Sequence, residues 1–502
     1  MKYLLLSITL ISSGMICAQS VEWESSFGGS ESEAGNGIFV TDGGKYIIAG
    51  ETASSDGDIS GYNGGSQDAY IVQLNGDGSL LNQYVLGGSE YDFFTKIAGD
   101  VDGGYVSVGY TGSSDGDLSS LPVFQNVWVY KVDPLSPWQN ALGGSGLDFG
   151  NDVIQTTDHD FMVVGRSTSN LSGYSGSIDF YVGKINQSNG TAQWQKCFGG
   201  TDIEIANGVT STSDGGGVVV GKTNSTNNDV TTSLGAYDVW VIRVDDTGNL
   251  IWQKSLGGSD DDIAYQAATV SDGYIITGST KSTDGDISSG LGGTDAFIAK
   301  TDLDGNLVWF KNYGGSGNDE FRDVEVDTDG NLFAVGHTYS NDNQVTDNHG
   351  SSDIWVIKTD SDGNLLDQRT IGGSLDDRGN DLTILDDNSV VITGSCSSSD
   401  GDATSNAGLK DLWVVKLDNT LEISTLTTPE TQLSIYPSPT TDKTIIKTDH
   451  LVQVVEVFDT YGKLVHSVVN SKEINLSNLP DATYILNIKT DKGTFTQKII
   501  KE

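Results

Sequence analysis

The chain repeats one unit seven times, and this periodicity constrains its fold more than any other feature. The pair Gly-Gly recurs every 56 to 59 residues, and a lone glycine that ends an apolar run keeps the same period. A third ladder, of aromatic residues, runs in step with both. The pairs begin at Gly28, Gly87, Gly143, Gly199, Gly257, Gly314 and Gly372; the lone glycines are Gly50, Gly109, Gly165, Gly221, Gly278, Gly336 and Gly394; the aromatic residues are Tyr70, Trp128, Tyr181, Trp240, Phe297, Trp355 and Trp413. Seven copies of such a unit indicate a repeat architecture.

Each unit is predicted to hold four antiparallel strands. In the fifth unit the expected strands are residues 264–270, 274–278, 296–301 and 307–313, and Asp-Gly and Gly-Asn turns separate the members of each hairpin. No stretch of the body has a helical period. Four antiparallel strands repeated seven times predict a β-propeller, and we interpret the aromatic ladder as packing between its blades.

The ends of the body indicate how the ring closes. The seventh unit has a third strand near residues 412–417 but no fourth, whereas residues 21–27 form an extra strand before the first unit. If that strand completes the last blade, no sheet edge stays open. Over residues 21–418 the repeats resemble those of bacterial secreted β-propeller proteins, a resemblance that implies the fold and is nearly silent on function.

The first eighteen residues are predicted to be a secretory signal peptide. Lys2 precedes an apolar run from Tyr3 to Ile11, and small residues lead to a cleavage site after Ala18. In an alternative interpretation, Cys17 is acylated as in lipoproteins. With cleavage after Ala18, Cys17 leaves with the signal peptide, and the remaining cysteines, Cys197 and Cys396, are expected to lie on different blades, buried and unpaired. No later segment is apolar enough to span a membrane, so we do not expect an integral membrane protein.

The last 72 residues differ from the body. Eight lysines balance eight acids in residues 431–502, so the acidity of the chain belongs to the body. Short alternating segments predict a small β-sandwich. The segment resembles the type A C-terminal sorting domain of the type IX secretion system of Bacteroidetes, although Ser438 stands where that family usually has Asn. The motif residues are Tyr436, Pro437, Pro439, Gly462 and Lys463.

The resemblance implies that the type IX machinery exports the chain across the outer membrane. The product is then released or attached at the cell surface. The expected organisation is a signal peptide in residues 1–18, a propeller in 19–420, a linker in 421–430 and a sorting domain in 431–502. The fold class is therefore all-β, a seven-bladed propeller followed by a small sandwich.

One acidic register recurs in all seven units, five residues after the first glycine of each pair. These acids open the innermost strands and are expected to ring the mouth of the central channel, where they are either structural turn residues or a cation or ligand site. They are Glu33, Asp92, Asp148, Glu204, Asp262, Asp319 and Asp377. A related register, just before the third strand, is interpreted as turn formers: Asp68, Asp179, Asp238, Asp295, Asp353 and Asp411, with Asn126 in the second unit.

Four long loops on the same face carry the motif Asp-Gly-Asp. Two carboxylates around a glycine can wrap a Ca²⁺ ion, which takes six to eight oxygen ligands, although no loop has a complete calcium-binding motif. Ordinary turn chemistry is the competing interpretation. The residues are Asp56, Asp58, Asp115, Asp117, Asp284, Asp286, Asp400 and Asp402.

Composition limits the function. The formal net charge of −42 repels phosphate backbones, so nucleic-acid binding is not expected. Catalytic motifs are scarce. We call the face that carries the long loops and the channel mouth the top face, and of the five arginines in the body only Arg166, Arg322 and Arg378 are placed to lie on it. The first hypothesis is a binding or adhesion protein whose top face engages a glycan, a cation or a surface protein. The alternatives are a polysaccharide hydrolase or lyase that uses top-face carboxylates, and a structural scaffold.

Overall fold

The computed structural model describes residues 21–121, 125–133, 136–418, 434–436, 438–448, 451–459, 463–490 and 493–502. These residues are almost entirely strands and turns, with one short 3₁₀ turn, η1 (Gly116–Leu118). None of the helical structure in these ranges is long and apolar enough to cross a membrane. The chain divides into two units, residues 1–421 and 422–502.

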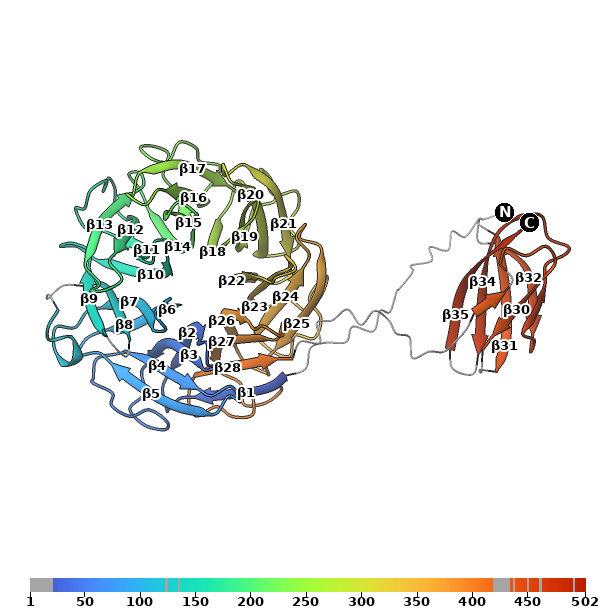
Figure 1. The fold of residues 1–502 in the computed structure, drawn as a ribbon, viewed down its shortest axis with the longest axis horizontal. Coiled ribbons are helices and arrows are strands. Elements are labelled where there is room, and N and C mark those ends of the chain that lie inside the picture. Colours follow the sequence, from blue (N-terminus) through green and yellow to red (C-terminus); the bar gives the residue numbers. More distant parts are fainter. Residues whose placement is uncertain are drawn as a thin grey trace. The chain divides into compact units, whose positions relative to one another are not determined.

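Residues 21–418 form seven four-stranded antiparallel sheets arranged in a ring (Figure 1). We number these sheets as blades 1 to 7, starting from the sheet that opens with β2. The strands are, for blade 1, β2 (Glu33–Val40), β3 (Tyr46–Thr52), β4 (Asp68–Leu74) and β5 (Leu80–Leu86); blade 2, β6 (Asp92–Gly99), β7 (Tyr105–Thr111), β8 (Asn126–Val132) and β9 (Trp138–Leu142); blade 3, β10 (Asp148–Gln155), β11 (Phe161–Ser167), β12 (Asp179–Ile185) and β13 (Ala192–Phe198); and blade 4, β14 (Glu204–Ser211), β15 (Gly217–Thr223), β16 (Asp238–Val244) and β17 (Leu250–Leu256). They continue, for blade 5, with β18 (Asp262–Val270), β19 (Gly273–Thr280), β20 (Asp295–Asp302) and β21 (Leu307–Tyr313); blade 6, β22 (Asp319–Val326), β23 (Leu332–Thr338), β24 (Asp353–Thr359) and β25 (Leu365–Ile371); and blade 7, β26 (Asp377–Ile384), β27 (Val390–Cys396) and β28 (Asp411–Leu417) with β1 (Val21–Phe27). The predicted all-β propeller class is confirmed.

Strand β1 closes the ring. It pairs antiparallel with β28, from Val21 opposite Leu417 to Phe27 opposite Leu412, and so becomes the outer strand of blade 7. Side chains add to this pairing: the indole nitrogen of Trp413 donates to Glu24 at 2.8 Å. The first and last strands of the propeller therefore share one sheet, as the sequence predicts, and β28 has no free edge.

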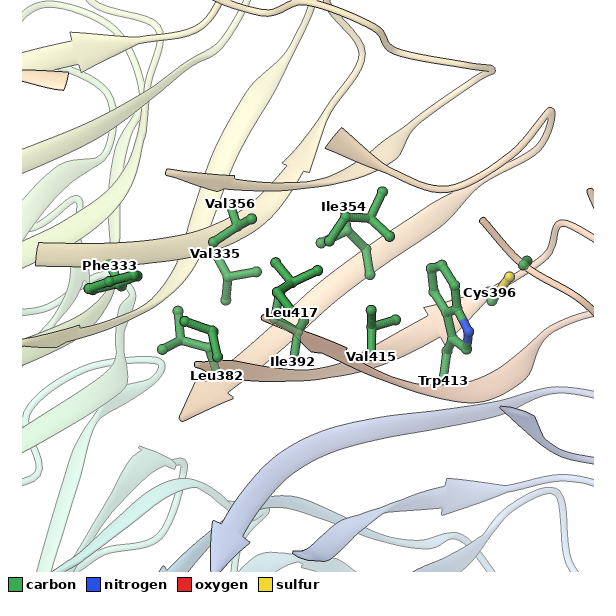
Figure 2. Packing of buried hydrophobic residues seen from close by; sticks show 13 residues of the cluster. Phe333, Val335, Ile354, Val356, Leu382, Ile392, Cys396, Trp413, Val415 and Leu417 are labelled. Atoms are coloured by element: carbon green, nitrogen blue, oxygen red, sulfur yellow. The ribbon is translucent and has the colours of Figure 1, made fainter. Parts of the chain in front are cut away.

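The hydrophobic core lies between neighbouring blades. Figure 2 shows one such layer, in which Val335 and Ile354 of blade 6 meet Ile392 and Trp413 of blade 7. β-branched residues suit this position because they pack well on pleated surfaces. The seven aromatic residues of the third ladder are at most 1% exposed, in line with their predicted packing role, and Cys197 and Cys396 are buried and free.

A second contact joins neighbouring blades at the outer edge. In blade 3 the ring of Trp194 lies over Gly248, in the turn between the last two strands of blade 4, and its nitrogen donates to the carbonyl of Asp246 at 2.8 Å. Gly248 has φ +73°, and a Cβ there would lie 2.9 Å from the indole. The turn thus needs glycine both for its backbone conformation and for the ring above it. Trp23, Trp138, Trp252 and Trp309 make the same contact at other junctions.

The C-terminal unit contains two antiparallel sheets. One holds β29 (Ser434–Tyr436), β30 (Lys443–Lys447) and β33 (Glu473–Asn475); the other holds β32 (Leu464–Val469), β31 (Val452–Asp459), β34 (Ala482–Thr490) and β35 (Gly493–Lys501). Ile446 and Ile474 of the first sheet share a buried cluster with Val455, Leu486 and Ile499 of the second. Two sheets around one small core are the arrangement expected of a sandwich.

Candidate functional site

The seven acids of the first register are buried at the start of the innermost strands, and each is at most 1% exposed. In blade 2, Asp92 accepts hydrogen bonds from the Gly88 amide at 2.9 Å and from the hydroxyls of Thr111 at 2.6 Å and Ser113 at 2.7 Å. All seven accept from the second glycine of the Gly-Gly pair. These bonds give the carboxylates of Glu33, Asp92, Asp148, Glu204, Asp262, Asp319 and Asp377 a structural role, and a ligand role for them stays a prediction.

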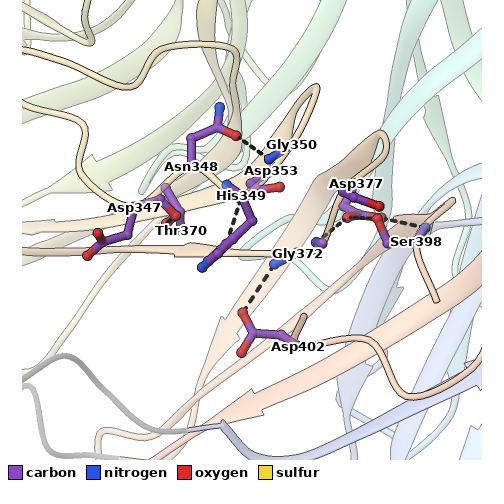
Figure 3. A network of polar contacts seen from close by, with 12 residues as sticks. Asp347, Asn348, His349, Gly350, Asp353, Thr370, Gly372, Asp377, Ser398 and Asp402 are labelled. Carbon is purple, nitrogen blue, oxygen red and sulfur yellow. Dashed lines mark hydrogen bonds and ion pairs between the residues drawn. The ribbon is translucent and has the colours of Figure 1, made fainter. Parts of the chain in front are cut away.

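The carboxylates of the Asp-Gly-Asp loops accept hydrogen bonds from the backbone of the same Gly-Gly turns. In blade 7, Asp400 accepts from the Ser374 amide at 2.8 Å. Asp402 accepts from the Gly372 amide at 3.2 Å, as Figure 3 shows. Gly401, between them, has φ +68°, and a Cβ there would lie 2.3 Å from the Gly372 carbonyl oxygen. Asp56, Asp58, Asp115, Asp117, Asp284 and Asp286 repeat these bonds in blades 1, 2 and 5. The motif fixes the base of each long loop to the start of its own blade.

This geometry bears on the calcium hypothesis. No group of three or more His, Cys, Asp or Glu side chains in the described residues is placed to hold a metal. We expect the unfolding midpoint of the mature protein to change by less than about 1 °C between excess Ca²⁺ and chelator, because these carboxylates already bind backbone amides. Selective binding at 100 times the dissociation constant would add about 2.7 kcal/mol and raise the midpoint clearly. A Ca²⁺-specific rise would make the four loops metal sites.

The acids before the third strands occupy an unusual environment at the blade junctions. Asp179 accepts from the Ser175 amide at 2.7 Å through one oxygen, while its Oδ1 is buried and has no hydrogen-bond partner in the part of the chain that the structure describes. The same holds for Asp68, Asp238, Asp295, Asp353 and Asp411. Burial raises the pKa of Asp179 to about 6 and that of Asp68 to about 7, with the acid of the following blade adding to the increase in both. The six hydrogen bonds agree with the predicted role of these acids as turn formers. The raised pKa values show in addition that burial disfavours the charged form of the carboxyls.

A polar layer crosses the channel partway along its length. The Lys96 amine of blade 2 lies 2.6 Å from Asp381 of blade 7 and 3.3 Å from Asp323 of blade 6. Gln266 of blade 5 donates to Asp152 of blade 3 at 3.2 Å. Burial lowers the pKa of Lys96, but the two aspartates outweigh it and hold this pKa above its ordinary value. We call these five residues the crossing layer.

The crossing layer separates two cavities. The lower one has a volume of about 1010 Å³ and the upper one, at the end where the innermost strands begin, about 260 Å³. Lys96, Asp152 and Gln266 line both. A small ligand that enters from the upper face therefore meets the charged and amide side chains of this layer.

The walls of the upper cavity are nearly sevenfold symmetric, and the exceptions are informative. Asn36 donates to the Phe94 carbonyl of the next blade at 2.8 Å, and an Asn or Thr repeats this bond in four other blades. Blades 5 and 6 carry Tyr265 and Arg322 at this register instead. The Arg322 guanidinium lies 4.2 Å from the centre of the Tyr265 ring. The symmetry of the channel is thus broken on one side.

The rim of this cavity differs from blade to blade. The residue after each channel-mouth acid stands opposite the residue after the lone glycine, and we call these cross-strand neighbours the rim pairs. They are Ala34–Glu51, Phe93–Tyr110, Phe149–Arg166, Ile205–Lys222, Ile263–Ser279, Glu320–His337 and Arg378–Ser395. One register away from seven buried acids, five Asp and two Glu, the rim pairs are all different, as a specific binding site requires.

Blades 2 and 3 form an aromatic arc on the rim. The rings of Tyr91 and Phe93 lie 5.2 Å apart, those of Phe93 and Tyr110 5.6 Å apart, and those of Tyr110 and Phe149 are stacked at 4.3 Å. The guanidinium of Arg166 covers Phe149 at 4.2 Å. Phe93 lines the upper cavity and Tyr91 is 40% exposed. Tyr91 and Phe93 therefore offer apolar ring surface to a ligand, whereas the Phe149 ring is already in contact with Tyr110 and Arg166.

Blade 6 forms a polar arc. Glu320 pairs with Arg322 and lies 3.4 Å from Nδ1 of His337. Burial raises the pKa of Glu320, but Arg322 and His337 outweigh it and bring that pKa below its ordinary value. Burial lowers the pKa of His337 to about 4, so its imidazole is neutral near pH 7, and its Nδ1 has no hydrogen-bond partner among the described residues.

The rim pairs were not among the residues singled out from the sequence, except for Arg166 and Arg378. Arg322, also expected at the top, lines the upper cavity. The missed signal is present in the ladders themselves. The positions that follow each acid read Ala, Phe, Phe, Ile, Ile, Glu and Arg, in units whose neighbouring positions repeat.

Comparison with known protein families identifies the C-terminal unit. Residues 434–502 match the family model of the secretion system C-terminal sorting domain. The C-terminal unit is this sorting domain.

The sorting domain directs the chain to the type IX secretion machinery and so to the cell surface or the extracellular space. Of its motif residues, Tyr436 is 50% exposed, and the Lys463 amide donates to Asp459 at 2.9 Å. Pro439 lies in the described part of the domain, whereas Pro437 and Gly462 lie outside the described residues. The predicted sorting-domain resemblance and export are confirmed.

Other similarities concern the body. The regulatory protein FlaEY of Caulobacter vibrioides is 27% identical over 175 residues, which are 32% of this chain and 18% of that relative. The WD40 β-propeller domain of Doa1 has 10% identity and a TM-score of 0.45, over 81% of this chain and 100% of that one. A protein of unknown function from Dyadobacter fermentans DSM 18053 has 11% identity and a TM-score of 0.44, over 80% and 100%. None of these proteins lends the chain a function, so the function is argued from the rim and the upper cavity.

Proposed function

We propose that this exported propeller is a binding protein, released or displayed at the cell surface, whose upper cavity and rim pairs engage a glycan. The asymmetry of the rim carries the proposal. The buried acids, the hydrogen bonds of the Asp-Gly-Asp loops and most of the hydrogen bonds from channel asparagines to the next blade repeat around the ring, as a structural role requires. The rim pairs, one register away, diverge into an aromatic arc and a polar arc above the crossing layer.

A glycan suits this surface better than a flat protein partner. The upper cavity has the volume of one or two sugar rings, and its wall combines the Phe93 ring with amide groups such as Asn36 and Asn380. Aromatic faces stack on the apolar side of a sugar ring, and amides exchange hydrogen bonds with hydroxyls. Attachment to a second macromolecule would also give such a protein an adhesive role.

The test is binding of the full mature chain to an array of oligosaccharides, followed by calorimetric titration of each hit. Phe93→Ala is expected to weaken binding about tenfold, which is about 1.4 kcal/mol. Tyr84→Ala is the matched control, since Tyr84 is 47% exposed on the outer strand of blade 1. The proposal is contradicted if no oligosaccharide binds at millimolar concentration, or if both variants bind as the wild type does.

A hydrolase or lyase is the second candidate, and Glu51 favours it. Burial raises the pKa of this rim carboxyl, with Lys410 opposing the change, whereas the pKa of Glu320 on blade 6 is lowered. Carboxyls whose pKa values are pushed apart are the groups that acid and base catalysis use. Release of reducing ends from a bound oligosaccharide, abolished in Glu51→Gln with binding retained, would favour the enzyme. Binding without turnover would favour the binding protein.

A further inference from the structure

The arginines of the propeller divide into two groups. Arg243, Arg322 and Arg369 each pair with a carboxylate, at 2.8 Å for Arg243 and 3.3 Å for Arg369. The remaining two, Arg166 and Arg378, have no carboxylate within ion-pair distance among the described residues, and both stand in rim pairs. In a chain with 69 acids and 27 bases, arginines without an acidic partner are unexpected, and both occur at the candidate site.

Lys222, in the neighbouring blade 4, is also a rim cation without a carboxylate partner among the described residues. Its amine lies 4.4 Å from the centre of the Tyr237 ring, and no carboxylate of the described residues lies within ion-pair distance. Burial lowers the pKa of Lys222, and the nearby charge of Arg166 lowers it further, although Asp261 opposes both. Burial also lowers the pKa of Arg166. Two partly buried cations thus stand close enough to repel each other, on adjacent blades and at one end of the aromatic arc.

We infer that Arg166 and Lys222 receive the carboxylate of an acidic sugar whose ring lies against the aromatic arc. The inference rests on the proposed function and names the class of glycan. A partly buried cation without a partner is costly, and a ligand carboxylate offsets that cost. Arginine holds a carboxylate through two parallel hydrogen bonds, and its position over Phe149 holds the guanidinium plane in place.

The charge of the whole protein narrows the ligand further. A net charge of −42 repels polyanions at long range, while a pair of cations on adjacent blades attracts a single carboxylate at short range. The preferred ligand is therefore an oligosaccharide that ends in one uronic acid, and a polyuronate is disfavoured. The guanidinium of Arg378, an exposed residue of blade 7, remains available to sugar hydroxyls.

The test uses two trisaccharides that differ only in a terminal glucuronic acid or glucose, titrated into the full mature chain at low salt. The acidic form is expected to bind about tenfold more tightly, with a preference that shrinks as salt is added. Arg166→Gln and Lys222→Gln are each expected to bring the ratio of the two affinities down from about ten to about one, whatever each variant does to binding of the neutral form. Lys45→Gln is the matched control, because Lys45 is an exposed lysine in the turn between β2 and β3, at the end of blade 1 far from the rim. Polygalacturonate is expected to bind more weakly than the singly charged trisaccharide.

The outcomes separate this inference from the proposed function. Equal binding of both trisaccharides, weakened by Phe93→Ala but not by Arg166→Gln, would overturn the acidic-sugar inference and leave the glycan-binding function in place. A peptide with a free C-terminal carboxylate, used as a further probe, would overturn the inference if it alone bound in an Arg166-dependent way. If neither trisaccharide nor any arrayed glycan bound, the proposed function itself would fail.

Discussion

A mature chain that lacks residues 21–27 is expected to lose cooperative folding as a monomer and to associate through the exposed edge of β28. The deletion leaves blade 7 with three strands and removes Trp23 from its contact with Gly78 of blade 1. It also removes Glu24, which accepts from Trp413, and Ser26, which donates to Asp411 at 2.8 Å. Loss of large buried side chains costs about 3–5 kcal/mol each, so we expect the midpoint to fall by about 10 °C or more.

Two measurements check this expectation. Light scattering after size exclusion reports association, which an open strand edge promotes. Tryptophan fluorescence reports the propeller alone, because all nine tryptophans lie between residues 23 and 413. A synthetic peptide of residues 21–27 added in excess should restore a monomer with a higher midpoint, whereas a scrambled peptide should not. A deletion variant that remained monomeric with an unchanged midpoint would show that β1 does not close the ring.

The propeller is expected to unfold at a higher temperature near pH 5 than near pH 8. Burial raises the pKa of Asp68 to about 7 and of Asp179 to about 6, and it also raises the pKa of the other four acids of this register. A carboxyl whose pKa is higher in the folded chain contributes stability that is complete below about pH 4 and is lost as the pH rises through the folded value. The loss therefore falls between about pH 4 and pH 7, and we expect the midpoint to drop by at least about 5 °C from pH 5 to pH 8.

Carboxyls whose pKa is lowered by folding act at the other end of the scale. Burial raises the pKa of Asp245, but the hydrogen bonds from the threonine and asparagine of its turn together outweigh it and lower this pKa to about 2. Such groups contribute stability above about pH 4 that is lost on further acidification. The two effects together place the highest stability near pH 5.

Two variants test the assignment to these carboxyls. Asp68→Asn with Asp179→Asn should flatten the drop from pH 5 to pH 8, since amides do not ionise. The second blade supplies the matched control, because Asn126 already occupies this register there. Asn126→Asp should steepen the drop. A wild-type profile that is flat, or that rises toward pH 8, would contradict the prediction.

The sequence predicts the architecture well because turns and apolar runs are local properties that the seven copies report repeatedly. Asp-Gly turns, β-branched runs and the displaced strand at residues 21–27 are enough to place all blades and their closure. The prediction extends to the start of β2 at Glu33, where the acidic register begins.

Side-chain direction is harder to predict than strand position. The channel-mouth acids do begin the innermost strands, yet hydroxyls two positions apart on the next strand, such as Thr111 and Ser113, hold Asp92 inside the blade. A one-residue step along the strand reverses the face, which is why the rim falls on Phe93 and Tyr110. The crossing layer could not be predicted either, since Lys96 and Asp381 are 285 residues apart and meet only when the ring closes.

The crossing layer also has a mechanical consequence. In a ring whose members touch only their neighbours, small tilts add up around the circumference, and the bore can widen or narrow at little cost. Lys96 links blade 2 to blades 6 and 7 across the channel, and Gln266 links blade 5 to blade 3. These side chains therefore connect blades that are not neighbours in the ring. Rim groups on opposite blades are thereby held at a constant separation. A ligand that touches both sides meets a mouth whose width is already set before it arrives.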